Sequence, residues 1–72
     1  DGALLMSLAE LCAYQQLWGK AQSYAEAALA VAPSVDAHLA LATLKEKSGQ
    51  HTEACGHLKQ ALAMCQNRNP SS

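Results

Sequence analysis

The stretch LWGKAQSYAEAALAVAP, residues 17–33, decides the fold of this chain. Within it, small and apolar side chains recur at a spacing of three and four residues, which places them on one stripe of a helix. Pro33 ends that helix, because its ring clashes with the preceding turn and its nitrogen has no proton to donate. The stretch therefore predicts a helix that packs its stripe against the rest of the chain. The stripe consists of Ala21, Ala25, Ala28 and Leu29.

The same pattern occurs twice in the chain. A shift of 33 residues superimposes apolar residues of the first half on apolar residues of the second. The matched pairs are Leu8 with Leu41, Ala9 with Ala42, Leu11 with Leu44, Ala21 with Ala54, Ala28 with Ala61, Leu29 with Leu62 and Ala30 with Ala63. A period in the thirties with two helices per period is typical of a helical repeat array. We therefore predict an all-α fold of two stacked antiparallel helical hairpins, with repeats over about residues 2–34 and about residues 35–66.

The first helix is expected over about residues 3–16, and the second follows a bend at residues 17–19 and runs to about residue 32. The third and fourth are expected over about residues 35–48 and about residues 52–66. Ser34 is a good N-cap for the third helix, and Asp36 suits the positive first turn of that helix. Gly49 is expected to end it in the left-handed conformation. The polar stretch NRNPSS, residues 67–72, cannot bury enough apolar surface to order itself, so we predict a disordered tail.

The break between the first two helices is less clearly marked. Gln16 stands where a turn glycine would be most comfortable. We expect the bend at residues 17–19, because Gly19 relaxes the backbone there. Trp18 lies at this bend and has two interpretations, an exposed contact for a partner or a cover for the edge of the core. The second is the commoner place for such a tryptophan, and we expect it here.

Helical spacing also predicts which side chains face inward in the other three helices. They are Leu4, Leu5, Leu8, Leu11 and Cys12 in the first helix, Ala37, Leu41, Ala42 and Leu44 in the third, and Ala54, Leu58, Ala61, Leu62 and Cys65 in the fourth. Leu39 is expected on another side of the third helix. The charged run Lys45, Glu46 and Lys47 is expected to solvate the end of that helix.

Charge and cysteine content limit the partners and the compartment. The formal net charge is −1, and no stripe of basic residues is present, so nucleic acid is not an expected partner. The apolar runs are shorter than the roughly 20 residues of a membrane helix, so we expect no membrane insertion by this segment. Three cysteines without a CxxC spacing indicate free thiols in a reducing compartment, and we expect a cytoplasmic location.

The residues that could carry chemistry are scattered. His51 and Cys55 share a helix face, but His57 points away from them, and no second pair completes a tetrahedral metal site. Surface histidines flanking a turn are the simpler interpretation, and His38 is expected to be a half-exposed packing residue. No nucleophile stands beside a base, and the carboxylates are dispersed. We therefore expect no enzyme activity, no catalytic residues, no bound metal and no cofactor, with haem binding by these histidines and cysteines as an alternative.

The two units resemble the tetratricopeptide repeat. The matching positions are Leu8, Ala9, Ala21, Ala28 and Pro33 in the first unit, and Leu41, Ala42, Gly49, Ala54 and Ala61 in the second. The chain departs from the family pattern at Gln16 in place of the turn glycine, at Gln66 in place of the closing proline, and in lacking the early tryptophan. Its period of 33 residues is also one shorter than the one the family favours.

The resemblance implies a groove along the first helix of each unit. The family's groove positions fall on Met6, Glu10, Ala13 and Tyr14 in the first unit and on Leu39, Thr43, Glu46 and Lys47 in the second. This set would form a mixed groove that binds a protein or peptide partner. The lysine and asparagine pattern that clamps a peptide's terminal carboxylate is absent, because Met6 and Glu10 occupy two of its places. Carboxyl-terminal chaperone peptides are therefore not expected ligands.

A narrower resemblance involves the strings LWGKA at residues 17–21, LATLKEKSG at residues 41–49 and LKQAL at residues 58–62. They are similar to the carboxyl-terminal repeats of HemY-type proteins, proteobacterial membrane-anchored proteins encoded with haem-biosynthesis genes. This resemblance implies a non-catalytic module that scaffolds or regulates haem-pathway enzymes. The alternative is a chaperone or secretion-cargo binder that holds an extended peptide in the same groove.

A stack of two hairpins leaves apolar faces at both ends. Such arrays usually need three or more repeats for stability. Because Leu4, Leu5, Leu58 and Leu62 would have few partners in an isolated stack, we expect the chain to associate with a second copy, as a homodimer, through these ends.

Overall fold

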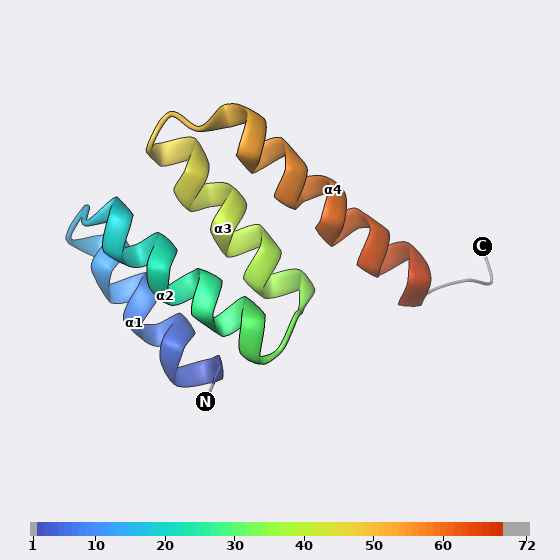
Figure 1. The fold of residues 1–72 in the computed structure, drawn as a ribbon, viewed down its shortest axis with the longest axis horizontal. Helices are drawn as coiled ribbons and strands as arrows, with labels where there is room; N and C mark the ends of the chain where they lie inside the picture. The colour runs from blue at the N-terminus through green and yellow to red at the C-terminus, as the bar shows by residue number, and fades with distance from the viewer. Residues whose placement is uncertain (1, 69–72) are drawn as a thin grey trace.

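The computed structural model describes residues 2–68, which form four α-helices in succession. They are α1 (Gly2–Tyr14), α2 (Trp18–Val31), α3 (Val35–Lys47) and α4 (His51–Arg68). The helices pack in chain order: α1 on α2, α2 on α3, and α3 on α4 (Figure 1). The described residues contain no strand. The prediction of an all-α fold of two stacked antiparallel hairpins is confirmed.

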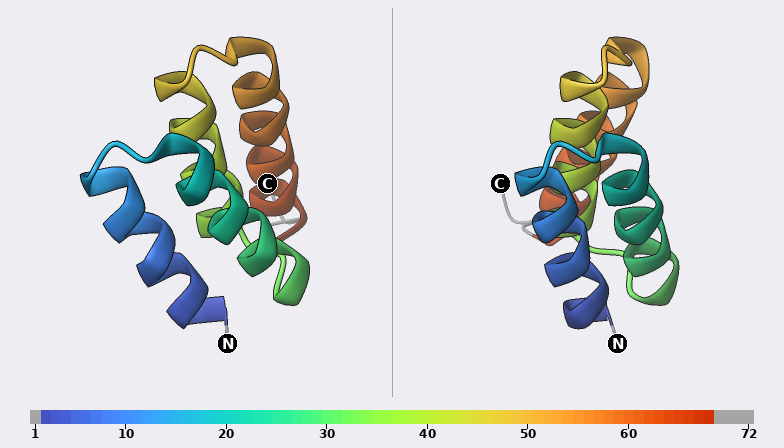
Figure 2. Two further views of the ribbon diagram at one scale, coloured as in Figure 1. Left: turned by 60° about the vertical axis from the view of Figure 1, so that its left-hand side comes forward. Right: turned by 90° about the vertical axis from the view of Figure 1, so that its left-hand side faces the viewer.

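The second hairpin lies against the first with its helices in the same order. Both short turns, between α1 and α2 and between α3 and α4, lie at the same end of the stack (Figures 1 and 2). The α2–α3 connection runs at the opposite end. Among residues 2–68, no helix combines the length and the apolar character that a bilayer crossing requires.

The turn after α1 closes through a Schellman motif. The backbone N–H of Leu17 donates to the carbonyl of Cys12 over 2.8 Å, and that of Gln16 donates to Ala13 over 2.9 Å. This closure places the residue after the helix in the left-handed region. Gln16 accordingly has a φ of 63°, a conformation that glycine adopts at less cost.

The turn after α3 repeats this motif 33 positions later. The N–H of Gln50 donates to the carbonyl of Lys45 over 2.7 Å, and that of Gly49 donates to Glu46 over 3.1 Å. Gly49 has a φ of 84°, which confirms the expected glycine C-cap. The sequence repeat is therefore also a repeat of backbone conformation.

Some predicted helix ends are corrected. The bend expected at residues 17–19 lies one to two residues earlier, because the Schellman closure requires positive φ at Gln16, and Gly19 sits inside α2. α1 stops at Tyr14, and α4 continues to Arg68, two residues beyond its predicted end. The remainder of the predicted tail, residues 69–72, lies outside the described residues.

The expected N-cap of α3 is present. The N–H of Ala37 donates to the Ser34 hydroxyl over 3.1 Å, and Ser34 has the extended backbone typical of a cap. Asp36 lies in the first turn, where its charge is favourable.

The core consists mainly of alanine and leucine from the first three helices. Its central cluster contains Ala9, Ala21, Ala25, Leu41 and Leu44. Trp18 and Leu29 are half-buried and pack against it, so the expectation that the tryptophan covers the core edge is confirmed. In α4, Ala54 and Ala61 are buried, as predicted.

Other side chains predicted to face inward do not. Leu4 and Leu11 on α1, and Leu58 and Leu62 on α4, are exposed. Each lies on α1 or α4, the outer helices of the stack, where no other helix of the described residues 2–68 covers it. Cys65 is also exposed, while Cys12 is half-buried against the core. Leu39 is exposed on the other side of α3, as expected.

Lys45 is buried, which corrects its prediction as a solvated residue. Its Nζ lies 2.9 Å from a carboxylate oxygen of Glu53 on α4 and 3.6 Å from one of Glu26 on α2. The hydrogen bond to Glu53 raises the pKa of Lys45, against the opposing effect of burial. Lys45 follows Leu41 and Leu44 on the flank of α3 that packs against the neighbouring helices. The charged group therefore joins three helices.

Replacing Gln16 with glycine is expected to stabilise the fold by about 0.5–1 kcal/mol, because glycine adopts positive φ without strain. The matched variant Gly49→Gln should lose about 1 kcal/mol; a Cβ there meets no atom within 4 Å, so the expected cost is that of the backbone conformation. Urea unfolding measures both. A loss of stability in Gln16→Gly would contradict the assigned turn.

A second pair of variants separates packing from charge at Lys45. Lys45→Ala is expected to lose about 2 kcal/mol, because it removes a buried stem. Lys45→Met should lose less than about 1 kcal/mol, because both carboxylate partners are more than half exposed and regain water. Urea unfolding checks the order of the two losses, and equal losses would show that the charge matters more than the stem.

Candidate protein-binding groove

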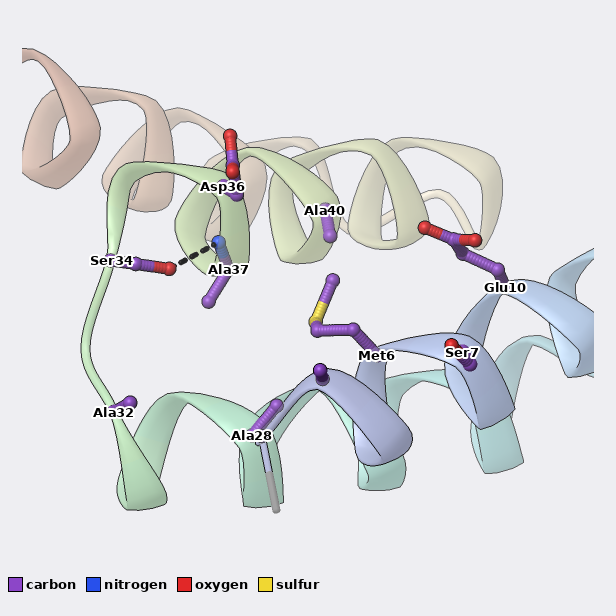
Figure 3. A pocket seen from close by; sticks show the side chains of 11 residues that line it. Met6, Ser7, Glu10, Ala28, Ala32, Ser34, Asp36, Ala37 and Ala40 are labelled. Carbon is purple, nitrogen blue, oxygen red and sulfur yellow. Dashed lines mark hydrogen bonds between the residues drawn. The ribbon is translucent and has the colours of Figure 1, made fainter.

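A hollow of about 690 Å³ opens between the two hairpins. α1 lies on one side and α3 on the other, with the end of α2 beneath (Figure 3). The residues that line it are Gly2, Ala3, Met6, Ser7, Glu10, Ala28, Ala32, Ser34, Asp36, Ala37 and Ala40. It is the larger of two adjoining hollows on this side of the stack.

The wall of this groove is small and apolar. Alanines from α2 and α3 supply much of it, and Met6 extends from α1 toward Ala40 (Figure 3). Methionine is flexible and polarisable, so it adapts to side chains of different shape. The alanines leave room for a ligand because they stop at Cβ.

The charge in this groove has one sign. Glu10 on α1 and Asp36 on α3 are the charged residues among those lining it, and both side chains are exposed. The Ser34 hydroxyl already accepts the N–H of Ala37, so it is engaged in the helix cap. A bound segment would therefore meet an apolar wall with one acidic residue at each edge, although the Asp36 carboxylate is directed away from the hollow in Figure 3.

The groove continues along α1 and α3 into a second hollow of about 200 Å³. Both hollows share Met6, Glu10 and Ala40. The further lining residues of the second are Ala9, Ala13, Thr43 and Leu44. The two hollows together follow the seam between the hairpins for several helical turns.

The structure brings together four of the eight residues predicted for the groove. Met6, Glu10, Ala13 and Thr43 line one or both hollows. The other four, Tyr14, Leu39, Glu46 and Lys47, line neither. Tyr14 has an exposed fraction of 89% and stands free at the end of α1.

The prediction chose equivalent positions on α1 and α3, but the groove is lined by opposite flanks of these helices. One flank of α1 faces α3 and carries Met6 and Glu10. The flank of α3 that faces α1 carries Ala37 and Ala40, which the groove prediction did not include. The spacing of three residues between these alanines was the available signal. Ser7, Ala28, Ala32 and Asp36 were also missed.

Histidines from α3 and α4 meet away from the groove. The Nδ1 atoms of His38 and His57 are 3.2 Å apart, with ring centroids separated by 5.4 Å. Both residues are half-buried. This confirms the prediction for His38 and corrects the prediction for His57, which was expected at the surface beside the turn. His51 is exposed, with Nδ1 3.4 Å from a Glu46 carboxylate oxygen. Within residues 2–68, no group of three or more histidine, cysteine or acidic side chains is arranged to hold a metal ion.

The surroundings of His57 favour its neutral state. Burial lowers the pKa of His57, and the neighbouring His38 and Lys45 lower it further, against smaller opposing effects of Glu26 and Glu53. One Nδ1–H can donate to the other Nδ1 only while the acceptor ring is unprotonated there. Protonation of both rings would direct two N–H groups at each other.

Acidification is therefore expected to destabilise the α3–α4 hairpin. His57 has a lower pKa when folded than its ordinary value of 6.5, so the unfolded chain binds more protons and stability falls as the pH drops below that value. Melting temperatures from about pH 7.5 to about pH 5.5 should decline in the wild type and decline less in His57→Gln. The exposed His51→Gln is the matched control. An equal decline in all three would refute the role of the pair.

Comparisons with protein families, with curated proteins and with solved structures found no match to this chain.

Proposed function

We propose that this chain is a non-catalytic protein-interaction module that holds a segment of a partner between α1 and α3. The observation that carries the proposal is the groove itself: a wall of alanine and Met6, open to solvent, with Glu10 and Asp36 on its two sides. The lining residues include no histidine or cysteine. The groove therefore lacks the thiol and imidazole groups that many nucleophilic sites use.

The chemistry of the groove indicates the kind of partner. Small apolar side chains fit a wall of alanines, and a lysine or arginine on the partner would complement the two carboxylates. A short peptide segment that combines these residue types is the proposed ligand. Because both carboxylates are exposed, their attraction to a basic residue is modest and weakens with salt.

The resemblance to HemY-type repeats suggests a specific setting for this module, the scaffolding or regulation of enzymes of haem biosynthesis. It rests on the strings LWGKA, LATLKEKSG and LKQAL in the sequence. The alternative setting, a chaperone or secretion-cargo binder, would use the same groove for an extended peptide. The two differ in the identity of the partner.

Peptide binding tests the groove directly. A panel of short peptides with alanine, valine and lysine or arginine should bind more tightly than the same peptides with glutamate in place of the basic residue. Glu10→Gln combined with Asp36→Asn should weaken the binding of the basic peptides about three- to tenfold, as expected for two exposed charges. Fluorescence anisotropy measures these affinities.

Two further variants keep this test specific. Ala40→Leu fills the groove and should abolish peptide binding while leaving the helical circular dichroism unchanged. Glu46→Gln removes a carboxylate outside the groove and should change binding little. Full binding by Ala40→Leu, or an equal effect of Glu46→Gln, would refute the groove.

A pull-down from a bacterial lysate then tests the setting. Haem-biosynthesis enzymes captured by the wild type and lost by Ala40→Leu would support the scaffold. Client or secreted proteins captured in the same manner would support the alternative. Peptide binding without capture of haem-pathway enzymes would refute the scaffold and leave the groove proposal intact.

A further inference from the structure

The 33-residue repeat gives every residue of the first hairpin an equivalent in the second. Two sets of leucines lie on the two outer sides of the stack, and all of them are exposed except Leu8, which is half-buried. We call Leu4, Leu8 and Leu11 on α1 the leading face. We call Leu39 on α3 together with Leu58 and Leu62 on α4 the trailing face.

The equivalents of the leading face are buried in the seam between the hairpins. They are Ala37, Leu41 and Leu44 on α3, with exposed fractions of 2%, 0% and 5%. Leu41 and Leu44 belong to one core cluster with Ala21 and Ala25 of the first hairpin. The leading-face positions of the second hairpin therefore pack on the first hairpin.

The equivalents of the trailing face form the other side of that seam. They are Met6, Ala25 and Leu29 of the first hairpin. Ala25 is fully buried, and Leu29 packs against the cluster that contains Leu41 and Leu44. The seam inside the chain is thus a contact between a trailing face and a leading face.

Within residues 2–68, one uncovered face of each kind remains. Leu4 and Leu11 are 61% and 54% exposed, and Leu58 and Leu62 are 46% and 58% exposed, whereas their equivalents are buried or half-buried. The same apolar positions are therefore available at opposite ends of the stack.

We propose that a second copy of this chain stacks head to tail, with the leading face of one copy on the trailing face of the other. This contact continues the seam that already joins the two hairpins. It joins unlike faces, so each added copy again presents one free face of each kind, and the assembly is open-ended. Leu4 and Leu58 replace Ala37 and Ala25, so the copies would pack further apart than the hairpins do.

The charges at the seam give this register a distinctive property. Inside the chain, Lys45 binds Glu26 and Glu53. At the seam between copies, the copy that contributes the leading face places Cys12 where Lys45 stands and Lys20 where Glu53 stands. The copy that contributes the trailing face places Lys59 where Glu26 stands. Two lysines would therefore lie near each other, and association should strengthen with salt, because salt screens their repulsion.

Complementation between two blocked variants tests the pairing of faces. Leu4→Glu with Leu11→Glu blocks the leading face, and Leu58→Glu with Leu62→Glu blocks the trailing face. All four positions are exposed, so both variants should keep the wild-type circular dichroism. Sedimentation from about 10 μM to about 1 mM should show growing association for the wild type and a monomer for each variant. An equimolar mixture of the two variants should form dimers and nothing larger.

Other outcomes overturn the proposal. A wild type that stays monomeric at about 1 mM would do so, as would a blocked variant that dimerises alone, because like faces would then pair. A mixture that stays monomeric while the wild type associates would also overturn it.

Lys59→Glu tests the register independently. It should tighten association about two- to fivefold, because the introduced carboxylate would face Lys20 of the next copy, and weaker association would refute the register. Val31→Glu, at an exposed position outside both faces, is the matched control.

Discussion

The rest of the structure depends on the close approach of helix backbones that alanine permits. Alanines are buried at equivalent positions of both hairpins, at 3% exposure or less. The pairs are Ala9 with Ala42, Ala21 with Ala54, and Ala28 with Ala61. Alanine removes little apolar area from water, so each hairpin alone gains little from burial. The larger side chains Leu41 and Leu44 are buried only where the hairpins meet, and the stack therefore supplies stability that neither hairpin has by itself.

Lys45 shows how the seam between the hairpins is also specified. Its ammonium group binds one carboxylate from α2 and one from α4, so it defines how α3 sits between them. Burying a charge costs free energy, but the two carboxylate partners keep contact with water and moderate that cost. This cluster of one lysine and two carboxylates is better understood as fixing the arrangement of three helices than as a large source of stability.

The same small residues shape the groove. Ala28 packs in the core and also lines the hollow between α1 and α3, together with Ala37 and Ala40. A surface of this kind can accept partner side chains of different shapes. Its selectivity would come from charge, which Glu10 and Asp36 supply here. The histidine pair on α3 and α4 lies apart from the groove, so the expected pH sensitivity of the fold and the proposed recognition of a partner involve different residues.

The sequence by itself determined the elements of this protein. Apolar spacing, Pro33, the Ser34 cap and Gly49 are local signals, because they act within a few residues of the chain. They placed four helices and their repeat, although the first bend and some helix ends lay one or two residues from their predicted positions. The tertiary structure alone decided the rest. Gln16 adopts positive φ because the Schellman closure that joins α1 to the α2 packed on it requires that conformation there, and Lys45 is buried because its flank of α3 meets two other helices. Which leucines are exposed, and which flanks line the groove, depend on the neighbours of each helix, and helical spacing does not encode those neighbours.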